Sequence, residues 1–138
     1  MKKIFLHVWI VIVLLFVSNL LIAKENKIVI DIIYFHATIR CQTCLTIEKY
    51  IWKSVESSFE KDLKDSSLTL TSLDFLQPEN EQYQEKYKFD TQTLIISKKV
   101  NGFETKWKNL DMIWDYVNDF KKFKKYIIKE IKNLRRGK

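Results

Sequence analysis

Two cysteines separated by two residues, Cys41 and Cys44, are the part of this sequence best suited to chemistry. They are the only cysteines in the chain. A thiolate is a nucleophile that attacks disulfide sulfurs, and a second thiol three positions along lies within disulfide reach of the first. The pair therefore predicts a redox-active dithiol, with thiol-disulfide exchange as its chemistry.

The surrounding residues predict how the dithiol is held. Residues 27–35 form an almost continuous apolar run, which is typical of a strand buried on both faces. After the cysteines, apolar residues recur every four positions from Ile47 to Leu63, which predicts an amphipathic helix over 44–63. The dithiol is therefore expected at the junction between a buried strand and the start of a helix.

Cys41 is the predicted nucleophile of the pair. It lies just ahead of the helix, where unpaired N–H groups and the positive end of the helix dipole stabilise a thiolate. Arg40 adds a positive charge beside it. Cys44 is then the resolving cysteine, which attacks the mixed disulfide and releases the product. The alternative is a non-catalytic binding module with a structural disulfide, although a bridge that closes so short a loop removes little unfolded-state entropy.

The rest of the chain completes an α/β pattern. After the first helix, the expected elements are a strand at 68–75, a short helix at 78–88, a strand at 91–97, a strand at 103–107 and a last helical region from 109 with a break at 118–119. Asn101-Gly102 predicts a hairpin turn because both residues accept positive φ. The order β-α-β-α-β-β-α predicts two βαβ-like units, a parallel first half closed by a hairpin, and helices on both faces of one sheet.

The N-terminus has the pattern of an export signal. A short positive segment, Met1 to Lys3, precedes an apolar run at 4–22, and Ala23 precedes charged residues. The run is close to the ~20 residues that span a bilayer, so residues 1–23 are expected to be a cleaved signal peptide or an N-terminal membrane anchor. Both put residues 24–138 outside the cytoplasm, in the periplasm, secreted or anchored, where an oxidising environment favours the disulfide.

Composition bounds the class of partner. Residues 24–138 are long enough for one domain with one core. Without Lys2 and Lys3 the formal net charge falls from +7 to +5, which is too little to indicate nucleic acid. The chain has only 2 glycines and no phosphate-binding loop, so no nucleotide is expected. A protein thiol or disulfide is the expected partner.

The strand, dithiol and helix order resembles the thioredoxin-like superfamily over residues 27–118. Phe35-His36-Ala37 stands where that family has an aromatic-rich turn, and residues 87–94 resemble the segment that leads into its third core strand. The resemblance implies a thioredoxin-like three-layer sandwich and disulfide exchange with a protein partner, in a direction that two spacer residues do not fix.

Three positions depart from that family, and a narrower group matches better. Gln92 stands where the family has a cis-proline that faces the dithiol, and Arg40 stands where it has a tryptophan. Tyr34 occupies the position of the family's buried acidic residue. The motif Arg-Cys-x-Thr-Cys, with the later segment 106–111, is similar to small exported thioredoxin-like proteins, some labelled nitrophenyl-compound nitroreductase subunits. Nothing in this sequence forms a flavin or nicotinamide site, and no cofactor is expected for the exchange reaction.

Three more residues are candidates for supporting roles. His36 is a turn residue, a proton carrier, or the third ligand of a copper(I) set with Cys41 and Cys44, because two sulfurs and one nitrogen suit that ion. Asp31 is a buried acid that manages protons for Cys44, or a strand residue that reaches solvent. Gln92 is a loop amide, or it hydrogen-bonds a substrate backbone or a sulfur.

The last helix carries many basic residues opposite its apolar face. They are Lys121, Lys122, Lys124, Lys125, Lys129, Lys132, Arg135 and Arg136. Such a face is either solvated or in contact with anionic lipid headgroups at a membrane surface. The sequence leaves both readings open.

Overall fold

The fold is that of a computed structural model, which describes residues 26–137. Its elements are β1 (Ile28–His36), α2 (Gln42–Lys64), β2 (Leu68–Asp74), the 3₁₀ turn η2 (Pro78–Asn80), α3 (Gln82–Tyr87), β3 (Thr93–Val100), β4 (Phe103–Asn109), the 3₁₀ turn η3 (Asp111–Ile113) and α4 (Phe120–Arg135). This order confirms the predicted β-α-β-α-β-β-α pattern. The expected signal or anchor at 1–23 lies outside the described residues. Within residues 26–137, no helix is long and apolar enough to cross a bilayer.

The four strands form one mixed sheet in the order β2-β1-β3-β4. β1 and β2 are parallel, as predicted, whereas β3 is antiparallel to β1 and to β4. Only the first of the two expected βαβ-like units is therefore parallel. The reason is the length of α3, because its 6 residues rise about 9 Å and cannot return the chain along a strand of about 27 Å. β3 consequently begins at the same end of the sheet at which β2 finishes.

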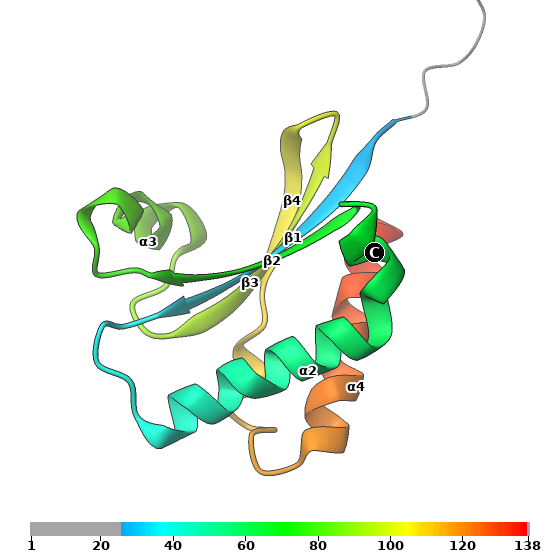
Figure 1. The fold of residues 1–138 in the computed structure, drawn as a ribbon. Coiled ribbons are helices and arrows are strands. Elements are labelled where there is room, and N and C mark those ends of the chain that lie inside the picture. Colours follow the sequence, from blue (N-terminus) through cyan, green and yellow to red (C-terminus); the bar gives the residue numbers. More distant parts are fainter. Residues whose placement is uncertain (1–25, 138) are drawn as a thin grey trace, which may run out of the picture.

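The sheet separates two layers of helices. Side chains alternate along β1, so Ile32 and Tyr34 lie on one face while Ile33 and Phe35 lie on the other. The first face is covered by α2 and α4, and the second by α3 with its flanking segments (Figure 1). These three layers form the sandwich that the sequence predicts, and residues 26–137 supply the hydrophobic core on both faces of its sheet.

Local signals set the ends of the last two elements. Asn101 and Gly102 have φ of 54° and 89°, which confirms the predicted hairpin turn. The predicted break at 118–119 is also confirmed, because Asp119 caps α4 by accepting a hydrogen bond from the Lys122 amide at 3.0 Å. Beyond that cap, four fully or almost fully buried residues hold α4 against the sheet and α2: Phe123, Ile127, Ile131 and Leu134.

Phe35→Ala tests the smaller core on the α3 face. Phe35 is 0% exposed, and its ring centroid lies 4.7 Å from that of Phe89. We expect the variant to lose about 3–5 kcal/mol of unfolding free energy in urea titrations. The control is Phe103→Ala, in which a 77% exposed ring is removed and the loss stays within about 0.5 kcal/mol. Equal losses in the two variants would contradict this packing.

Candidate functional site

The dithiol lies at the N-terminus of α2. Cys41 has extended backbone and is the N-cap residue of the helix, and its Sγ accepts a hydrogen bond from the Cys44 amide at 3.2 Å. The two cysteines form a disulfide with Cα atoms 5.1 Å apart. The helix begins at Gln42, earlier than the predicted start at 44, because Cys41 itself supplies the cap. The sulfur of Cys41 therefore lies at the positive end of the helix dipole.

The two cysteines differ in their access to solvent. Cys41 is exposed, whereas Cys44 is only 2% exposed. A sulfur of another protein can therefore reach Cys41 from solvent, whereas the surrounding residues block its access to Cys44. This difference fits the predicted roles, with an outer nucleophile and an inner resolving cysteine.

The structure brings Gln92 to the dithiol. Its side-chain oxygen Oε1 lies 3.7 Å from Cys44 Sγ, a distance at which the reduced thiol donates a weak hydrogen bond. The backbone carbonyl of Gln92 accepts a hydrogen bond from Trp114 Nε1 at 3.1 Å. Trp114 thus fixes the segment that faces the buried sulfur. Nothing in the sequence marks Trp114 as part of the site, because buried tryptophans also occur throughout ordinary cores.

Arg40 is tied to a carboxylate that sequence patterns assign to the solvent face of α2. Its guanidinium forms an ion pair with Glu48, and both side chains are largely covered, at 23% and 21% exposure. The other Glu48 oxygen, Oε1, accepts a hydrogen bond from Ser72 Oγ at 2.6 Å. Glu48 lies four residues after Cys44 and so on the same face of the helix, which is the one signal that could have indicated it.

Tyr34 contacts the first turn of α2 from the side of the sheet. Its hydroxyl donates a hydrogen bond to the Cys44 carbonyl at 3.2 Å, and its side chain is fully buried. The pKa of Tyr34 is raised to about 12, mainly by burial and in smaller part by the Glu48 carboxylate, while the charge of Arg40 opposes the rise. Tyr34 is therefore a neutral donor at physiological pH, and it connects β1 to the helix turn that carries Cys44.

Asp31 does not come near the dithiol. It follows the alternation of β1 onto the α3 face, opposite to α2. There it accepts a hydrogen bond from Thr69 Oγ1 at 2.8 Å and pairs with Lys99 Nζ at 2.5 Å. Asp31 thus ties β1 to the two strands beside it, and of its two predicted readings these contacts give no support to proton management for Cys44.

His36 ends β1, and its hydrogen bond is local. Its Nδ1 lies 3.0 Å from the Ala37 carbonyl. In the described part of the chain, no three His, Cys, Asp or Glu side chains converge as a metal-binding group. In the disulfide, neither Cys41 nor Cys44 is a thiolate, so copper(I) binding by the reduced protein stays a prediction.

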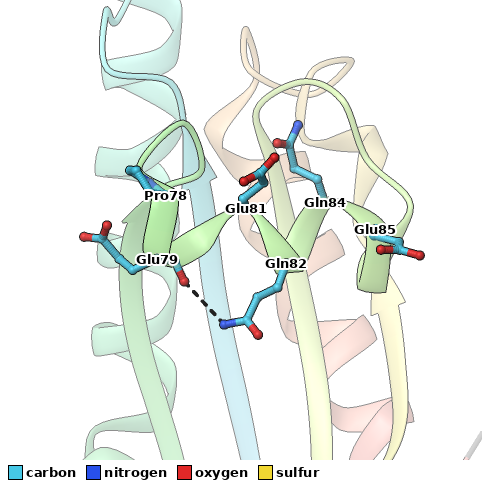
Figure 2. A pocket seen from close by; sticks show the side chains of 6 residues that line it. All are labelled: Pro78, Glu79, Glu81, Gln82, Gln84 and Glu85. Atoms are coloured by element: carbon cyan, nitrogen blue, oxygen red, sulfur yellow. Dashed lines mark hydrogen bonds between the residues drawn. The ribbon is translucent and has the colours of Figure 1, made fainter.

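Two hollows lie on different sides of the molecule. A groove of about 450 Å³ runs beside the dithiol between the first turns of α2 and residues 117–118. The larger hollow, about 680 Å³, lies at η2 and α3, where the side chains of three glutamates point outward from the ribbon and one hydrogen bond joins Gln82 to the Glu79 carbonyl (Figure 2). The groove is lined by Gln42 and Thr43, the two residues between the cysteines.

The basic face of α4 is largely exposed. Its exposed members are Lys121, Lys122, Lys125, Lys129, Lys132 and Arg136. Lys124 and Arg135 are instead partly covered and contact Ser57 and Asp62 of α2. Nothing in residues 26–137 shows what lies against the exposed face, so membrane contact stays a prediction.

Comparisons with known proteins find likeness in structure but not in sequence. No family model matches the chain, and no curated protein matches it. Oxidised thioredoxin O2 from Arabidopsis thaliana is 12% identical with a TM-score of 0.42, covering 68% of this chain and 74% of its own. Chloroplastic thioredoxin z is 18% identical with a TM-score of 0.38 (75% and 87%), and a structure titled only as a malarial protein is 20% identical with a TM-score of 0.38 (59% and 80%).

Partial alkylation tests the difference between the cysteines. After reduction, we expect limiting iodoacetamide at neutral pH to modify Cys41 at least about tenfold faster than Cys44, because Cys41 is exposed and capped by helix amides. Peptide mass spectrometry over time measures both rates. Equal rates, or faster labelling of Cys44, would contradict the assignment of the nucleophile.

Proposed function

We propose that this protein is exported and performs thiol-disulfide exchange with a specific protein partner through Cys41 and Cys44. The observation that carries the proposal is the arrangement of the disulfide: an exposed sulfur caps a helix, and its partner sulfur is buried beneath it. That arrangement gives one cysteine access to a partner and keeps the other ready to complete the reaction.

The reaction in the reducing direction begins with the Cys41 thiolate. It attacks one sulfur of the partner disulfide, so a mixed disulfide forms and a partner thiolate leaves. Cys44 then loses its proton and attacks Cys41 Sγ, which releases the second partner thiolate. Two electrons pass to the partner, and its two thiolates take up protons from Cys44 and solvent. The oxidising direction is the reverse.

Apolar side chains beside the dithiol support a protein partner. Ile39 is 88% exposed two residues before Cys41, and Leu45 is 44% exposed directly after Cys44. A bridge that served stability alone would not need apolar side chains in solvent around it. These side chains instead offer surface that a polypeptide covers when it docks over Cys41.

Trapping in the cell tests the proposal. Cys44→Ser leaves the nucleophile but removes the resolving thiol, so we expect covalent mixed disulfides with envelope proteins that dithiothreitol releases on non-reducing gels. Cys41→Ser is the control and should trap far less, because its remaining thiol is buried. The proposal fails if Cys44→Ser forms no mixed disulfide while it is folded and present in normal amount.

A further inference from the structure

Arg40 and Glu48 form a bridge from the residue before the nucleophile to the helix and the sheet. Arg40 pairs with Glu48 on α2, and Glu48 accepts the Ser72 hydroxyl at 2.6 Å from β2. Ser72 lies directly opposite Tyr34 in the register of β1 and β2. The guanidinium of Arg40 is thus held by a carboxylate that is itself anchored to the sheet.

The disulfide form contains one anion for this guanidinium, but the reduced form contains two. Reduction creates a thiolate at Cys41, one residue from Arg40. Both Glu48 and the thiolate then attract the same cation. An arginine that is held by a fixed carboxylate stabilises a neighbouring thiolate less than a free arginine does.

We propose that Glu48 is a positioning residue that sets the reduction potential of the dithiol by holding Arg40 away from the Cys41 thiolate. The proposal rests on the exchange reaction above and adds the residue that tunes it. Glu48 acts through Arg40 and does not itself react with the partner.

Other groups at this edge of the sheet do not replace Arg40. Tyr34 is neutral because its pKa is raised to about 12, and Gln92 is uncharged. Asp74 at the end of β2 accepts a hydrogen bond from Thr38, which lowers its pKa, and it therefore stays an anion. His36 at the end of β1 and Asp90 shortly before β3 also lie at this end of the sheet, so the thiolate is followed directly by its absorbance at 240 nm.

A double-mutant cycle on residues 24–138 tests the proposal. Glu48→Gln should shift the equilibrium with glutathione about tenfold toward the dithiol, or about 30 mV, and move the thiolate absorbance profile to lower pH. Arg40→Gln should shift both in the opposite direction. The variant with both changes should lie close to Arg40→Gln, because the main effect of Glu48 passes through Arg40.

Glu60→Gln is the matched control on the same helix. Glu60 pairs with Lys64, both side chains are 74% exposed, and we expect its loss to leave the potential unchanged. Glu48→Gln without effect, or with the same effect in the Arg40→Gln background, would overturn the proposal. The absorbance profile needs no partner, so it tests the role of Glu48 independently of the exchange reaction. Failure of the exchange reaction itself would appear as a wild-type dithiol that does not equilibrate with glutathione.

Discussion

The structure of the site depends on one capping interaction at the start of α2. Cys41 ends the loop after β1, and its sulfur accepts the amide of Cys44, so the residue that caps the helix is also the exposed member of the disulfide. The helix dipole and the position of the second sulfur follow from that single geometry. Tyr34 fixes the same turn from the sheet by its hydrogen bond to the Cys44 carbonyl.

Around this cap, the molecule places neutral groups under the buried sulfur and charged groups beside the exposed one. Gln92, just before β3, and Tyr34 of β1 contact Cys44 without bringing charge. Arg40, directly before the outer cysteine, forms a largely covered ion pair with Glu48. Since a thiolate responds to fixed charge much more than a neutral thiol does, the charge of Arg40 acts mainly on the nucleophile beside it.

The sequence predicts what depends on local patterns. The strand before the cysteines, the helix after them, the Asn101-Gly102 turn and the break at Asp119 each carry short-range signals, and all are found. Contacts between distant residues were harder to predict. Arg40 pairs with Glu48, 8 positions away, and the Gln92 carbonyl accepts from Trp114, 22 positions away. The face on which Asp31 lies depends on the alternation of side chains along β1.

The reduction potential of the Cys41–Cys44 pair tests the central claim most directly. Equilibration of residues 24–138 with glutathione or dithiothreitol buffers, followed by alkylation of free thiols, measures it. A working exchange protein should show a reversible couple between about −120 and −270 mV, and the value would also indicate in which direction it drives its partner. A value below about −300 mV would contradict the account, because so stable a disulfide is a structural bridge.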